Sequence, residues 1–95
     1  TFRRREHEAI ITVIGKDKIG ILAMIANECA KANINVLDVS QTIVDGFFTM
    51  TMSVDLENMK TSLSSFSDHM DQLGKEKDLV IRVMHQDIFD SMHKI

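Results

Sequence analysis

A turn with two glycines holds the residues of this chain that are best suited to bind a small charged molecule. It joins a run of apolar residues to a helical pattern, and its members include Gly15, Asp17, Ile19, Gly20 and Ile21. The first N–H groups of a helix have no partner within the helix, so a helix that starts here offers a place for a carboxylate. The carboxylate of Asp17 is placed to meet an ammonium group. The turn therefore suits an α-amino acid, which carries both charges.

The same turn also has a purely structural explanation. Asp17 lies three residues before Gly20, so its carboxylate could cap the helix that follows. Gly20, which has no side chain, would then let the start of the helix pack tightly against the preceding strand. In this interpretation the turn binds nothing, and the residues of the turn are compatible with both.

Other reactive residue types are not arranged for catalysis or metal binding. The histidines lack the close spacing of a metal motif, and the acidic pairs fit a chain end or the first turn of a helix. Cys29, the single cysteine, falls on the apolar side of a helical pattern, so we interpret it as a buried hydrophobic residue. We therefore expect no enzyme activity, no metal site and no cofactor. The other residues concerned are His7, His69, His85 and His93, Glu6 with Glu8, and Asp87 with Asp90.

Size and charge argue against several further functions. The 95 residues make one domain, and 44% hydrophobic with 26% charged residues is ordinary for a globular protein. A net charge of −3, with no Tyr and no Trp, argues against a nucleic-acid surface. No apolar run reaches the roughly 18 residues of a membrane span, and we find no signal-peptide pattern. We expect a cytoplasmic protein without membrane or nucleic-acid partners.

The spacing of apolar residues predicts the secondary structure. Strands are predicted where apolar residues alternate or run together, and helices where they recur every three or four positions. Asp45 and Gly46 form a two-residue hairpin signal, and Gly74 is predicted to end the second helix, which Glu57 or Asn58 would cap. The predicted strands cover residues 9–14, 34–44, 47–55 and 79–84, and the predicted helices cover residues 19–31, 58–73 and 87–95.

The two long helices differ in their apolar faces. The first has apolar residues over an arc of roughly 200°, with Leu22 and Ile25 near its middle and Met24 on its polar side. The second has an apolar stripe of only about 80°. We therefore expect the second helix to lie on the surface, and the first to keep apolar area left over after it packs on one sheet.

The order of elements, βαββαβ followed by a helix, predicts an α+β fold. Two βα units joined by a hairpin give the ferredoxin-like two-layer sandwich, a four-stranded antiparallel sheet with two helices on one face, here with a short C-terminal helix. The second strand would be an edge with one charge, Asp38, so an edge-to-edge dimer would cover both this edge and the spare area of the first helix. Residues 1–8 are expected to be an N-terminal extension, disordered or foreign to the natural chain, and residues 9–95 the domain.

Three short stretches carry a recognisable pattern. They are Gly15-Lys16-Asp17-Lys18-Ile19-Gly20-Ile21, Ala32-Asn33-Ile34-Asn35-Val36 and Val39-Ser40-Gln41-Thr42. Together with the order of elements, these stretches resemble the ACT-domain family over residues 9–95. The likeness is greatest to small stand-alone bacterial ACT proteins related to the halves of the glycine cleavage repressor.

The resemblance implies regulatory binding of an amino acid, as in the regulatory domains of phosphoglycerate dehydrogenase and the aspartokinases. In that family the ligand lies between two domains, held by the first loop of one and the second strand of the other. By position, the residues that this implies are Asp17, Ile19, Gly20 and Ile21 in the loop and Asn35 at the second strand. A single domain would hold half of such a site, so the resemblance implies a homodimer or a larger oligomer.

Two hypotheses follow for the function. The first is a non-catalytic regulatory module that binds a small amino acid at a dimer interface formed by the second-strand edge and the first helix. Gly15 stands where a serine-binding relative has a histidine contact, which argues against serine as the ligand. The alternative is a protein-interaction adaptor that docks a partner through the dimer or the C-terminal helix and binds no metabolite.

Overall fold

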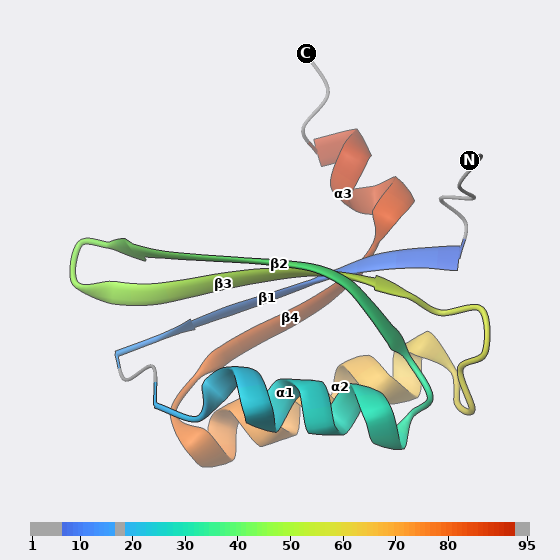
Figure 1. Cartoon of the computed structure of the whole chain (residues 1–95), viewed down its shortest axis with the longest axis horizontal. Coiled ribbons are helices and arrows are strands. Elements are labelled where there is room, and N and C mark those ends of the chain that lie inside the picture. Colours follow the sequence, from blue (N-terminus) through green and yellow to red (C-terminus); the bar gives the residue numbers. More distant parts are fainter. Residues whose placement is uncertain (1–6, 17–18, 93–95) are drawn as a thin grey trace.

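The chain forms one four-stranded sheet with two helices packed on one of its faces (Figure 1). The computed structural model describes residues 7–16 and 19–92, so Asp17 and residues 1–6 of the predicted extension lie outside the described part. The strands are β1 (Glu8–Gly15), β2 (Asn35–Val44), β3 (Phe47–Asp55) and β4 (Val80–His85), and the helices are α1 (Ile21–Lys31), α2 (Leu63–Lys77) and α3 (Gln86–Met92).

The strands pair in the order β2-β3-β1-β4, and each pairing is antiparallel. This is the predicted ferredoxin-like sandwich, with β1 in the centre and β2 and β4 at the edges. α1 and α2 cover one face, whereas α3 lies on the opposite side of the sheet (Figure 1). α3 begins at Gln86, directly after β4 and one residue earlier than predicted.

The core lies between the sheet and the two long helices. Alternate residues of β1 and β3 point into it, because side chains of a strand alternate between the two faces. The apolar face predicted for β3, from Phe48 to Val54, is confirmed, since its four members are at most 4% exposed. Burying each large side chain stabilises the fold by roughly 1.5–3 kcal/mol. The core residues of these elements are Ala9, Ile11, Val13, Ile21, Ile25, Cys29, Phe48, Met50, Met52, Val54, Phe66, Met70 and Ile81.

The edge strand β2 contains one irregularity. Val36 pairs with Val54 and Asp38 pairs with Ser53, so Leu37 has no residue opposite it on β3. One extra residue in one strand of an antiparallel pair is a β-bulge. The strand then continues in regular register to the hairpin, where the predicted turn residues 45 and 46 both have positive φ, 52° and 81°.

α1 begins two residues later than predicted. Its N-cap is Gly20, which has a φ of 74°. Glycine has no side chain that could accept a hydrogen bond from the helix, so this end has no side-chain cap. A residue in this left-handed region cannot belong to the helix, and glycine is the residue that adopts it without strain. The helix therefore starts at Ile21 rather than Ile19, and Asp17 does not occupy the N-cap position.

The predicted ends of α2 are also wrong. Its N-cap is Ser62, whose hydroxyl accepts a hydrogen bond from the Ser65 N–H at 3.0 Å. At the other end the helix continues through Gly74 to Lys77, and Asp78 ends it with a φ of 59°. The chain after α2 passes close to Gly74, and a Cβ at position 74 would lie 2.7 Å from the Leu79 carbonyl oxygen. A glycine therefore fits at this position inside the helix, where a larger residue would be crowded.

The buried face of α1 is turned slightly from the predicted one. The fully buried row is Ile21, Ile25 and Cys29, whereas Leu22, predicted near the middle of the arc, is 38% exposed. Met24, predicted on the polar side, instead packs partly buried against the core. α2 lies on the same face of the sheet (Figure 1), and His69 of α2 contacts Glu28 of α1, so the surroundings of α1 include a second helix as well as the sheet.

Replacing Gly74 by alanine tests the close contact between α2 and the Leu79 carbonyl oxygen. Alanine is the better helix former by about 1 kcal/mol, so an uncrowded position would become more stable. Because the added Cβ would meet the Leu79 oxygen, we expect the free energy of unfolding to fall by about 1–3 kcal/mol, measured by urea denaturation. Gln72→Ala on the exposed side of the same helix is the control, and a gain in stability for Gly74→Ala would contradict the crowding.

Candidate functional site

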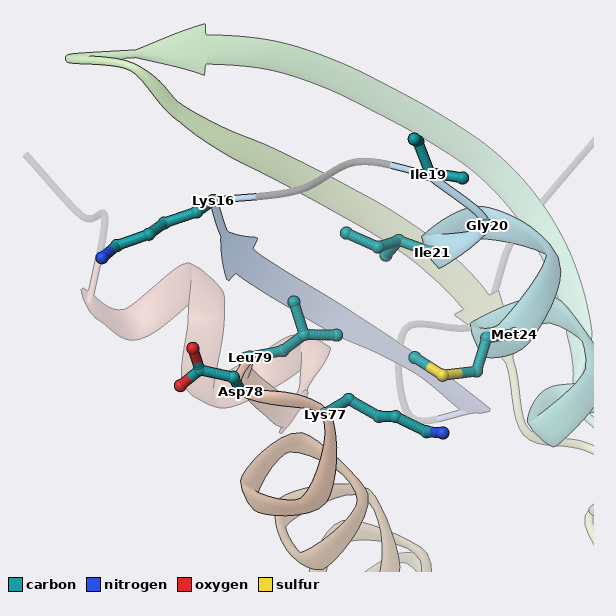
Figure 2. A pocket seen from close by; sticks show the side chains of 8 residues that line it. All are labelled: Lys16, Ile19, Gly20, Ile21, Met24, Lys77, Asp78 and Leu79. Carbon is teal, nitrogen blue, oxygen red and sulfur yellow. The ribbon is translucent and has the colours of Figure 1, made fainter.

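A cavity of about 230 Å³ lies beside the turn between β1 and α1. One wall is the N-terminus of α1, and the other is the corner where α2 ends and β4 begins (Figure 2). The lining residues are Lys16, Ile19, Gly20, Ile21, Met24, Lys77, Asp78 and Leu79. The cavity combines an apolar interior with three charged residues.

Three of the five predicted site residues line this cavity. Ile21 is 4% exposed and forms part of its floor, whereas Ile19 is 85% exposed at its edge. Gly20 connects them, and a Cβ built on it would have no atom within 4 Å. The glycine is therefore favoured by its positive φ. The tight packing against the strand, which the purely structural explanation of the turn predicted, is wrong. Asp17 lies outside the described residues.

Asn35, the fifth predicted residue, does not belong to the cavity of its own chain. It pairs with Asp55, which pairs with Glu8 at the first residue of β1. The turn follows Gly15 at the other end of β1. Seven residues of antiparallel strand separate these ends by roughly 24 Å. The two halves of the predicted site are thus apart within one chain.

The sequence motifs missed the α2–β4 corner. Lys77, Asp78 and Leu79 supply the second wall of the cavity. The predicted topology contained a signal for them, because β4 runs antiparallel to β1 and its start must then lie beside the end of β1. In the structure Ile14, next to the last residue of β1, pairs with Val80, the first residue of β4.

A second polar cluster joins the last part of α1 to the middle of α2. Oε1 of Glu28 lies 2.7 Å from Nε2 of His69, and Oε2 lies 3.5 Å from Nζ of Lys31. The His69 side chain is 57% exposed, whereas the Glu28 side chain that it contacts is 12% exposed. Burial by itself would raise the pKa of the Glu28 carboxyl, but the hydrogen bond with His69 and the charge of Lys31 outweigh it and lower that pKa.

The thiol of Cys29 is poorly placed to react. Cys29 is fully buried, as predicted, and burial together with the neighbouring Glu28 carboxylate raises the pKa of its thiol to about 11. A thiol with such a pKa is a poor nucleophile at neutral pH. Within residues 7–16 and 19–92, no group of three or more His, Cys, Asp or Glu could hold a metal ion. None of the helices in that part of the chain is long and apolar enough to cross a membrane.

Comparison with known proteins assigns the family. The sequence profile of the ACT domain matches residues 7–84. The chain belongs to the ACT-domain family. A UPF0237 protein of Clostridium perfringens is 44% identical over 87 residues, which cover 92% of this chain and 98% of that protein. A UPF0237 protein of Methanosarcina acetivorans is 43% identical over 86 residues, which cover 90% and 94%. In both relatives the matched range is nearly the whole protein.

Solved structures show the same fold. An ACT domain protein from Streptococcus pneumoniae aligns with a TM-score of 0.77 and 34% identity, covering 87% of this chain and 93% of that chain. A putative glycine cleavage system transcriptional repressor aligns at 0.67 with 21% identity, over 80% of this chain and 43% of that one. A formyltetrahydrofolate deformylase from Pseudomonas syringae aligns at 0.71 with 19% identity, over 81% and 26%. The last two share the fold alone. The ACT resemblance inferred from the sequence is confirmed.

The contact between Glu28 and His69 predicts a pH-dependent contribution to stability. Because the pKa of Glu28 is lowered in the folded state, the contribution is present above the ordinary pKa of glutamate and is lost as the pH falls through the folded value. At pH 7 we expect Glu28→Gln to lower the free energy of unfolding by about 1 kcal/mol or less, since His69 is largely exposed. Urea denaturation at pH 7 and pH 3 measures this.

The difference between Glu28→Gln and the wild type should be smaller at pH 3 than at pH 7, because the pKa of Glu28 is lowered but the carboxylate still gains protons as the pH falls. Glu76→Gln, an exposed change on α2 with the same loss of charge, is the control and should have little effect at either pH. Equal destabilisation by Glu28→Gln at both pH values would contradict an electrostatic contribution from the pair.

Proposed function

We propose that this ACT-domain protein is a non-catalytic regulatory module that binds a small amino acid at the turn between β1 and α1 and acts as a homodimer. The observation that carries the proposal is the cavity of about 230 Å³ at that turn. Drug-sized ligands occupy pockets of roughly 300–1,000 Å³, so this cavity fits a smaller molecule. ACT domains are typically regulatory modules for small ligands, which supports the same assignment.

The non-catalytic part of the proposal is supported by the extent of the domain. The ACT profile covers residues 7–84, and relatives of the same length are matched almost end to end. Residues 7–84 are thus accounted for by a domain that is typically regulatory. Its cysteine, the strongest nucleophile available, is buried and protonated at neutral pH.

The edge strand β2 provides the surface for a dimer. Nine of its residues pair with β3, with Leu37 left out, and the middle one is Ser40. If two copies pair antiparallel along the whole strand, Ser40 lies on the two-fold axis and Asn35 comes opposite Val44 of the second copy. The outer side of this strand has no partner strand among the described residues, and Ile43 and Val44 are 56% and 53% exposed.

The bulge makes this pairing compatible with the faces of the sheet. Asn35 and Val44 pair with Asp55 and Phe47, which are an even number of residues apart on β3 and so point to the same face. Opposite residues of an antiparallel pair must also share a face. With a regular strand in place of the bulge, the two ends of β2 would point to opposite faces.

The dimer would bring Asn35 of one copy to the same end of the sheet as the turn of the other. Ile43, next to Val44, pairs with Phe48, which in turn pairs with Gly15 at the turn. Asn35 of the second copy therefore arrives at the end of the sheet that holds the turn, although it lies far from the turn of its own chain. Three strand spacings, roughly 14 Å, still lie between that Asn35 and Gly15. The amino-acid site of the proposal is therefore the cavity of one chain, with Asn35 of the other copy at the same end of the sheet.

α1 adds a second element to the proposed interface. It contacts β2, so it lies toward the same edge of the molecule. Leu22 is 38% exposed, and the small apolar residues Ala23 and Ala30 are also exposed. A second copy that pairs with the β2 edge would cover apolar surface of this helix and stabilise a domain that is small on its own.

A thermal-shift screen over the common L-amino acids tests the proposed function. A ligand at about 100 times its Kd stabilises the folded state by roughly 2.7 kcal/mol. For a domain of this size, the midpoint of unfolding should then rise on the order of 10 °C. The D-enantiomer of each positive ligand is the control and should shift the midpoint less. If no amino acid at millimolar concentration shifts it, the proposal fails, and a dimer without a ligand would favour the adaptor.

Light scattering tests the dimer. The wild type should have about twice the 10.8 kDa mass of one chain at micromolar concentration. Ser40→Lys places two like charges side by side on the proposed axis, so we expect it to shift the protein toward the monomer. Val80→Lys, at an exposed position of the other edge strand, is the control and should leave the mass unchanged. A dimer that persists with Ser40→Lys but dissociates with Val80→Lys would place the interface at β4 instead.

A further inference from the structure

The interior of the cavity is apolar, and this restricts the side chain of a ligand. Ile21 and Leu79 extend toward each other across it, and Met24 lies at one side (Figure 2). Ile21 is buried, and Leu79 and Met24 are half-buried. A hydrocarbon group gains free energy by leaving water for such surroundings, whereas a hydroxyl or carboxylate without a hydrogen-bond partner loses it. The interior therefore favours an aliphatic group.

The α2–β4 corner presents one negative charge at the edge of the cavity. Asp78 ends α2 with a φ of 59°, and its N–H donates a hydrogen bond to the carbonyl oxygen of Gly74. Its backbone is thus fixed, while its side chain is exposed. In Figure 2 the carboxylate of Asp78 lies on the same side of the cavity as Lys16.

The two charged groups do not neutralise one another. Among residues 7–16 and 19–92, no ion pair joins Lys16 with Asp78. One cationic and one anionic side chain at the same side of a cavity can bind the two charges of a zwitterion, with the charges reversed.

We propose that Asp78 binds the ammonium group and Lys16 the carboxylate of an α-amino acid whose aliphatic side chain lies between Ile21 and Leu79. The ligand class is that of leucine, isoleucine, valine and methionine. This inference rests on the proposed function and deepens it. In this proposal Ile21 and Leu79 select an aliphatic side chain, and Lys16 and Asp78 bind the two charged groups that all α-amino acids share.

Other small metabolites match these groups less well. A carboxylic acid without an amino group would bring its charge beside Asp78 with no ammonium to offset the repulsion. An amine without a carboxylate would have the same difficulty at Lys16. A serine-like ligand would place a hydroxyl on apolar surface. An acidic side chain would have to cross the apolar interior to reach Lys77, which lies beside Met24 (Figure 2).

Isothermal titration of the full chain tests the inference. The probes are L-leucine, L-methionine, L-serine, L-glutamate and 4-methyl-2-oxopentanoate, which has the carbon skeleton of leucine without the ammonium group. In the wild type, leucine or methionine should bind most tightly. Asp78→Asn should weaken leucine by about tenfold, as expected for one charge-assisted hydrogen bond. It should leave 4-methyl-2-oxopentanoate unchanged or tighter, whereas Lys16→Gln should weaken both.

The variants are matched so that a folding defect is not mistaken for lost binding. Asparagine tolerates the left-handed backbone of position 78, and the unfolding midpoint should equal that of the wild type. Asp68→Asn removes the same charge from an exposed position of α2, about 15 Å along the helix, and should change no affinity.

The outcomes separate the inference from the proposed function. If no amino acid binds the wild type, the proposed function itself fails. If amino acids bind but Asp78→Asn weakens leucine and the keto acid equally or not at all, only the assignment of Asp78 fails. If serine or glutamate binds most tightly, the proposal that the ligand has an aliphatic side chain is wrong.

Discussion

The antiparallel pairing of β1 with both of its neighbours is the constraint on which the rest of the structure depends. It places the end of β1 beside the start of β4, as the pairing of Ile14 with Val80 shows. It also places that end beside the β2–β3 hairpin, since Gly15 pairs with Phe48. The turn after β1 and the corner before β4 must therefore be neighbours, although they are far apart in the sequence. The cavity is a consequence of strand order, and the side chains at its walls decide its chemistry.

Most of the architecture was predictable because burial imposes a period on the sequence. The alternation in β3 and the continuous apolar run in β1 identify a half-buried and a central strand, and the hairpin residues at 45 and 46 connect two strands in register. The ends of the helices were less predictable. Gly74 resembles a helix terminator, but it occurs where the chain folds back on α2, and only the three-dimensional path of the chain reveals that contact.

The candidate site was predictable in part for the same reason. Ile19, Gly20 and Ile21 were found because a strand-to-helix turn is recognisable in the sequence, and they do line the cavity. The α2–β4 corner has no motif of its own and follows only from topology. The pair of Glu28 and His69 had no signal at all, because it depends on how two helices face each other, which the spacing of residues within each helix does not determine.

The walls of the cavity differ from those of most loop-built sites. Gly20 is the N-cap of α1, and Asp78 is the C-cap of α2, so each wall is the end of a helix whose backbone is held by hydrogen bonds. Ordering a flexible loop on binding costs free energy, and a preorganised site avoids most of that cost. What remains to be ordered is chiefly long side chains such as Lys16 and Lys77, each with about 2 kcal/mol of rotamer entropy. Among the lining residues that the structure describes, the two lysine side chains therefore have the most conformational entropy to lose on binding.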